Sequence, residues 1–209
     1  SLVALTGMLA AITMAGSAQD DLWTGILGLV VALVAGMFVG VVNGASVAWL
    51  RLVPFIVTLA TLAMSRGLTL AVSDGQTRFG FPDSYTFLGG GNIAGLQMPV
   101  IVMLVVFAAG HLLLRHTSFG HQVFAVGGNP EAARLAGVPV KRVIFFVYVI
   151  AGVCAGIAGI VLTGRLDSAL PSAATGLELQ VIAGIVIGGT SLAGGRGSIV
   201  GTFVGVLLI

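Results

Sequence analysis

The sequence predicts an all-α fold, a polytopic bundle of transmembrane helices, some of them broken or re-entrant. Of its 209 residues, 57% are hydrophobic and only 8% are charged, whereas soluble domains carry about 25% charged residues. The apolar residues gather in runs close to the roughly 20 residues that a membrane-spanning helix needs. Glycine occurs 32 times, which in membrane helices favours close packing between backbones.

Seven apolar runs are candidate spans. Some are short, so we expect broken or re-entrant helices where protein or a water-filled cavity covers the backbone. Both ends of the sequence lie within apolar runs, which predicts a single transmembrane domain, residues 1–209, truncated at both ends. The predicted spans are Leu2 to Ala18, Leu22 to Val42, Pro54 to Val72, Met98 to Leu114, Val143 to Thr163, Leu179 to Ala193 and Ser198 to Ile209.

Glycines recur four residues apart in several of these runs. This spacing puts them on one helix face, where two backbones can approach closely. We therefore expect packing faces at Gly36, Gly40 and Gly44, at Gly152 and Gly156, at Gly184 and Gly188, and at Gly201 and Gly205.

A long polar interruption, Phe119 to Arg142, contains the pattern of a short helix. Asn129 can cap its start, and Pro130 suits its first position. Gly137 is placed to end it after about two turns, too few to cross a membrane. Spacing alone leaves two interpretations: a docking element for a partner, or a helix that lies on the surface of its own protein.

The charges predict that residues 115–142 are cytoplasmic, because basic residues concentrate in cytoplasmic loops. Alternating outward from this loop leaves two long outside segments, Ser73 to Gln97 and Gly164 to Gly176, in which we expect ordered turns or short interfacial helices. They are either connectors or docking surfaces for a soluble partner. With this arrangement most basic residues of the loops are cytoplasmic, as the rule requires. The cytoplasmic ones are Arg51, Arg115, Arg134, Lys141, Arg142 and Arg196, and those on the outside are Arg78 and Arg165.

The glycine-rich run Gly188 to Gly197 would make a poor continuous helix. It lacks the GxxxxGK[ST] order of a phosphate-binding loop. A broken helix whose Thr190 and Ser191 hydroxyls face a pathway fits better, as does a tight inside turn at Arg196. Arg66 lies within a span, where it is either functional or reaches towards the membrane surface.

Several functional classes find no support in the residues. His111, His116 and His121 do not converge with carboxylates or cysteines, which argues against a metal site. The single cysteine, Cys154, indicates a core thiol. No nucleophile with a base and an orienting group is visible, so we expect no catalytic residues. The basic residues are scattered, which makes nucleic acid an unexpected partner.

The sequence resembles the membrane permease subunits of bacterial sugar ABC importers of the ribose, xylose and autoinducer-2 type. The resemblance rests on VGGNPEAARLAGVPVKR, on GLELQVIAGIVIGGTSLAGGRGSIVGT, and on NGASVAWLRLVPFIVTLATLAMSRGLTL followed by DGQ. It implies a multi-pass inner-membrane protein of about ten spans, a second permease chain, an extracytoplasmic sugar-binding protein and a cytoplasmic ATPase subunit that holds ATP and Mg. This chain itself would bind no cofactor. The implied coupling helix that fits the ATPase comprises Asn129, Pro130, Glu131, Ala132, Ala133, Arg134, Leu135, Ala136 and Gly137.

A polar sugar crossing an apolar medium needs hydroxyl and amide partners. The polar residues within apolar runs therefore form the expected substrate pathway: Asn43, Thr58, Thr61, Arg66, Thr190 and Ser191. Related permeases for branched-chain amino acids and nucleosides share the general plan. A secondary transporter driven by an ion gradient is the alternative from another class, in which the broken helices and Arg66 would form the substrate or ion site.

Overall fold

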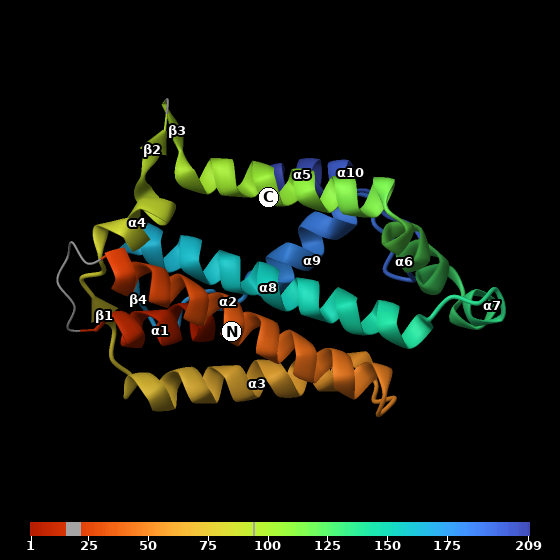
Figure 1. Ribbon diagram of the computed structural model, residues 1–209, viewed down its shortest axis with the longest axis horizontal. Coiled ribbons are helices and arrows are strands. Elements are labelled where there is room, and N and C mark those ends of the chain that lie inside the picture. Colours follow the sequence, from red (N-terminus) through yellow and green to blue (C-terminus); the bar gives the residue numbers. More distant parts are fainter. Residues whose placement is uncertain (16–21, 94) are drawn as a thin grey trace. The chain divides into compact units, whose positions relative to one another are not determined.

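The computed structural model describes residues 1–15, 22–93 and 95–209. Within them the chain is mainly helical, with two-residue strands between some of the helices (Figure 1). The elements are α1 (Leu2–Met14), α2 (Leu22–Ala48), α3 (Pro54–Ser73), β1 (Arg78–Phe79), α4 (Asp83–Gly90), β2 (Asn92–Ile93), β3 (Leu96–Gln97), α5 (Met98–His116), α6 (Ser118–Gly128), α7 (Pro130–Leu135), α8 (Val140–Leu166), β4 (Ser168–Ala169), α9 (Leu177–Ile187) and α10 (Ile199–Leu207). They form two compact units: unit 1 is Ser1–Ile101 with Phe145–Ala174, and unit 2 is Val102–Ile144 with Thr175–Ile209.

Four helices of the described residues, α2, α3, α5 and α8, are long and apolar enough to cross a membrane. Their most apolar stretches have mean hydropathies of 1.7 to 2.7, and α2 and α8 reach 27 residues each. These four helices agree with four of the predicted spans, and the protein is an all-α polytopic membrane protein. Helix α1 has 13 residues; the end of its predicted span, residues 16–18, lies outside the described residues.

The predicted span Leu179 to Ala193 is wrong as a single helix, because α9 ends at Ile187. Gly189 adopts a left-handed conformation with φ 81°. Its N–H donates to the carbonyl of Val186, and the N–H of Thr190 donates to the carbonyl of Ile185. This is the hydrogen-bond pattern of a helix that ends just before a left-handed glycine. The helix break predicted for the glycine-rich run is therefore observed, and α10 begins only at Ile199.

The glycine faces pack as predicted. In unit 1, Gly36 and Gly40 of α2 lie against the backbone of α8, so that a Cβ at Gly36 would collide with the carbonyl oxygen of Gly152. In unit 2, α9 and α10 run past each other with Gly188 against Gly201 and with Gly205 against the carbonyl of Gly184. Small residues are enriched where helices associate in a membrane, because they let the two backbones approach closely.

Helix α1 supplies much of the unit 1 core, with Met8, Ala10, Ala11 and Met14 buried against α2, α4, α8 and β4. Residues Ser65, Thr69 and Ser73 of α3 are also buried, at spacings of four residues. The structure corrects the prediction for Cys154, which is exposed on α8 and is not part of the core. Its neighbours Gly152 and Gly156 take the inward positions of that helix.

The two predicted outside segments contain short ordered elements, as expected. Strand β1 pairs with β4 and β2 pairs with β3, both antiparallel. Helix α4 buries Tyr85, whose hydroxyl lies 2.7 Å from the hydroxyl of Thr163. Burial raises the pKa of Tyr85 to about 12, because the charged phenolate would lose its hydration inside unit 1. The carboxylate of Asp167 accepts a hydrogen bond from the N–H of Phe81 at 3.3 Å.

Candidate functional site

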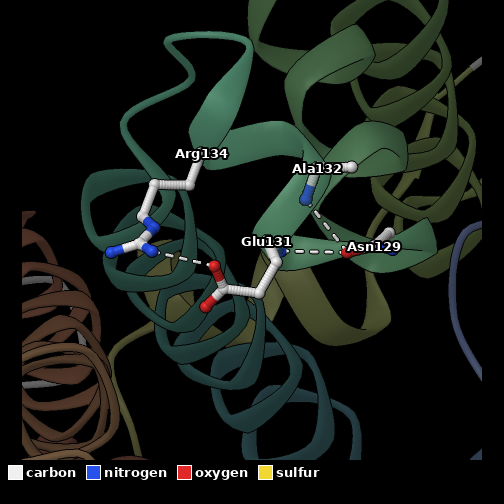
Figure 2. Close-up of polar contacts among 4 residues, drawn as sticks. All are labelled: Asn129, Glu131, Ala132 and Arg134. Carbon is white, nitrogen blue, oxygen red and sulfur yellow. Dashed lines mark hydrogen bonds and ion pairs between the residues drawn. The ribbon is translucent and has the colours of Figure 1, made fainter.

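Helix α7 begins as the sequence predicts. Asn129 has extended backbone angles, φ −155° and ψ 104°, and Pro130 occupies the first helical turn. The side-chain oxygen of Asn129 accepts hydrogen bonds from the N–H groups of Glu131 and Ala132, each at 3.0 Å (Figure 2). It thereby satisfies two of the backbone donors that a helix start leaves unpaired.

The end of α7 is also the predicted one. Gly137 has φ 84°, which costs glycine little and other residues more. Its N–H donates to the carbonyl of Arg134, and the N–H of Val138 donates to the carbonyl of Ala133, both at 3.0 Å. Together the two bonds form a Schellman motif. Six residues, Pro130–Leu135, are thus fixed as a helix by the residues on either side of them.

Helix α7 rests on its own protein through one residue. Ala133 is 5% exposed and packs with Val126 of α6 and Val143 of α8. Phe119, Val123 and Val138 surround this cluster. The inward side of the helix therefore fits the interpretation of a helix on its own protein's surface, and it holds α7 against α6 and the start of α8.

The opposite side of α7 is open. Its side chains project away from that cluster and are here called the outer face of α7: Glu131, Arg134 and Leu135. Glu131 and Arg134 form an ion pair at 2.9 Å with side chains 75% and 68% exposed (Figure 2). Leu135 is 84% exposed. An apolar side chain presented beside a fixed pair of charges is the kind of surface that a partner can cover.

Replacing Asn129 by alanine is expected to destabilise α7 by about 1 kcal/mol, because the N–H groups of Glu131 and Ala132 lose their acceptor. Hydrogen exchange of these two amides should accelerate about fivefold. A serine at position 129 restores a capping oxygen and should restore most of the protection. Equal exchange rates in the wild type and the alanine variant would show that the cap contributes nothing.

The pathway residues of unit 1 lie on α2 and α3. The hydroxyl of Thr61 donates to the side-chain oxygen of Asn43 at 2.5 Å, and Asn43 is 8% exposed. Thr58 instead bonds to the carbonyl of Pro54 of its own helix and is exposed. Arg66 also lies on an exposed part of α3. The structure thus brings Asn43 and Thr61 together and leaves Thr58 and Arg66 outside that pair.

Thr190 and Ser191 line a cavity of about 410 Å³ in unit 2, a size in the usual range for small-molecule sites. Thr190 lies 3.5 Å from Thr202, hydroxyl to hydroxyl. The hydroxyl oxygen of Ser191 accepts from the N–H of Ala193 at 3.2 Å. The walls are mainly apolar, from α5, α6, α9 and α10, and the further polar lining residues are Arg196, Ser198 and Thr202.

Sequence reasoning missed part of this lining. Thr202 could have been predicted from the sequence. It lies four residues after Ser198 at the start of an apolar helix, and this spacing puts both hydroxyl side chains on one helix face. Ser198 caps α10 by accepting from the N–H of Gly201, a role that its position before the run also predicts. The buried hydroxyls of Ser65, Thr69 and Ser73 were missed as well, although their spacing marks one face of α3.

These features define a class: a polytopic helical membrane protein with a short, capped and exposed helix, α7, in the segment that joins the long apolar helices α5 and α8. Comparison with known proteins then identifies the family. Residues 3–209 match the family described as "Branched-chain amino acid transport system / permease component", and the chain belongs to this family. It is a multi-pass protein of the bacterial inner membrane. A search of solved structures gives no match.

Several curated proteins are similar to the chain. The ribose import permease protein of Bacillus subtilis is 42% identical over 205 residues, covering 88% of this chain and 64% of that protein. The D-allose transport system permease protein of Escherichia coli is 39% identical and the L-arabinose ABC transporter permease protein of Azospirillum brasilense 40% identical, each over the whole chain. The chain spans 63% and 60% of the lengths of these last two.

Proposed function

We propose that the chain is part of the transmembrane permease subunit of an ATP-binding-cassette importer, which moves a pentose or similar monosaccharide from an extracytoplasmic binding protein into the cytoplasm. The observation that carries the proposal is the outer face of α7, a short helix fixed at both ends whose Glu131, Arg134 and Leu135 are exposed. The names of the relatives, which are ribose, allose and arabinose permeases, support a sugar as the solute. The family description leaves branched-chain amino acids as the alternative solute class.

In this proposal residues 115–142 are cytoplasmic, and Asn129 to Gly137 form the coupling helix. Closure of two ATPase subunits around ATP and Mg moves α7, and this rigid-body motion opens the membrane helices to one side or the other. The permease is a transport subunit and hydrolyses nothing itself. Two permease chains, surrounded by lipid, complete the membrane part, and both units of the chain belong to one transmembrane domain.

The proposed path combines apolar walls with a few polar groups, as small-molecule sites do. Thr190 and Ser191 at the cavity of unit 2 are its best candidates, and Asn43 with Thr61 is the second pair. The break at Gly188 and Gly189 makes α9 a helix of 11 residues, about 16 Å long and shorter than the hydrocarbon core. A broken or re-entrant segment of this kind is tolerated where it lines a water-filled cavity.

The test is the double substitution Glu131→Ala and Arg134→Ala in the full-length chain in membranes, with its ATPase subunit. An exposed ion pair contributes only about 0–1 kcal/mol to folding, so the chain should fold and insert normally. We expect co-purification of the ATPase and ATP-dependent uptake to fall about tenfold or more. The substitutions Lys141→Ala and Arg142→Ala remove two nearby charges outside α7 and serve as the control.

The outcomes separate the proposal from its rival. If association and uptake survive the double substitution, α7 is a passive connector. Uptake that needs an ion gradient and no ATPase would establish a secondary transporter instead. Competition by ribose, allose, arabinose or leucine during uptake then distinguishes a sugar from a branched-chain amino acid.

A further inference from the structure

Two backbones in unit 2 touch without any side chain between them. Gly127 lies near the end of α6, and Gly194 and Gly195 lie in the turn between α9 and α10. A Cβ at Gly127 would lie 2.7 Å from the backbone nitrogen of Gly195, and a Cβ at Gly195 would lie 2.7 Å from the Cα of Gly128. Real Cβ atoms do not approach backbone so closely, so only glycine fits on either side of this contact, here called the glycine contact.

Each side of the glycine contact leads to one of the two candidate sites. Gly127 comes two residues before Asn129, the cap of α7, and α7 is packed on α6 through Ala133 and Val126. Contact between packed backbones passes a displacement on directly, because protein interiors are dense and hardly compressible. A movement of α7 therefore carries the end of α6 with it.

The other side is a turn closed by its own hydrogen bonds. The N–H of Ser191 donates to the carbonyl of Arg196 at 2.9 Å, and the N–H of Gly194 donates to the carbonyl of Ser191 at 3.1 Å. The turn therefore moves as one piece together with Ser191. Gly127, Gly194 and Gly195 also line the cavity that Thr190 and Ser191 line, so a shift at the contact changes the wall of that cavity.

We propose that the glycine contact transmits the movement of α7 to the turn that bears Thr190 and Ser191, with Gly127 as the positioning residue. The inference rests on the proposed function, in which an ATPase drives α7, and adds the route by which that motion reaches the cavity. It predicts that the contact sets how much solute is moved for each ATP hydrolysed. The glycine contact does not bind the ATPase; in the proposed function the outer face of α7 does that.

The chain offers a matched pair of variants, Gly127→Ala and Gly128→Ala. Both residues lie in α6, but a Cβ at Gly128 meets nothing within 4 Å. We expect Gly127→Ala to lower the ratio of solute moved to ATP hydrolysed about fivefold or more in vesicles that hold the full-length permease, its ATPase and its binding protein. Gly128→Ala should keep the wild-type ratio. A protein that is merely less stable loses uptake and hydrolysis in proportion, so its ratio does not change.

A second measurement works if Gly127→Ala does not accumulate. In a Cys154→Ala background, Leu192→Cys places a thiol in the turn at a position that is 78% exposed and does not line the cavity. Maleimide labelling of this thiol should change in rate when ATP is added with the ATPase. An unchanged labelling rate during active transport would overturn the inference, as would a wild-type coupling ratio in Gly127→Ala or an equal loss in Gly128→Ala. A wild type without ATP-dependent uptake would instead overturn the proposed function, and this inference with it.

Discussion

Replacing Gly36 by alanine is expected to destabilise the folded chain by about 1–3 kcal/mol, the usual cost of inserting a methyl group into a packed core. Gly36 of α2 lies against α8, where a Cβ would collide with the carbonyl oxygen of Gly152 and lie 3.1 Å from the nitrogen of Gly156. The obstacle is backbone, which cannot rotate away as a side chain can. The two helices must separate, and the contacts along Gly40 and Gly44 weaken with them.

The matched control for this substitution is Gly67→Ala. Gly67 also lies within a helix of spanning length, α3, but a Cβ there meets nothing within 4 Å. Alanine has the higher helix propensity, so this variant should be neutral or slightly stabilised. The measurement is the temperature at which half of the detergent-solubilised protein remains monodisperse. Equal shifts in both variants would mean that the α2 to α8 contact is looser than the structure shows.

The features that the sequence predicted well depend on local chemistry. The cap at Asn129 and the stop at Gly137 follow from hydrogen bonds within one turn, which need no knowledge of distant residues. The glycine faces follow from helix periodicity, since residues four apart share a face whatever lies opposite. The sequence therefore predicted which faces of α2 and α8 would pack, although not that they would pack on each other.

The features that it missed depend on tertiary contacts. The exact end of α9 is one of them: the glycine-rich run Gly188 to Gly197 predicted a break, but the predicted span still reached Ala193, and the left-handed Gly189 ends the helix at Ile187. Cys154 looks like a core residue by hydrophobicity, but in a membrane both the core and the lipid-facing surface are apolar, so hydrophobicity does not distinguish them. The glycine contact joins Gly127 to Gly194 and Gly195, which lie 67 and 68 positions further along the sequence. No short motif encodes a pairing over that distance.

The substitution Leu135→Ala is expected to weaken binding of the ATPase subunit about 10- to 100-fold, because burying a leucine side chain contributes about 1.5–3 kcal/mol. Leu135 makes a clean test, since it is 84% exposed in this chain and exposed substitutions usually change folding by less than about 0.5 kcal/mol. In the proposed complex, Glu131 and Arg134 orient the ATPase subunit, and Leu135 supplies the apolar area that this subunit removes from water.

Leu192→Ala is the control for this prediction, because it removes the same atoms from a leucine that is 78% exposed in a different segment. ATPase binding to the permease in nanodiscs, titrated with purified ATPase subunit, should weaken for Leu135→Ala and stay at the wild-type value for Leu192→Ala. Equal affinities for Leu135→Ala and the wild type would remove Leu135 from the interface. Loss of binding in both variants would mean that the ATPase covers a wider surface than α7, and that the short helix is not the principal contact between the two subunits.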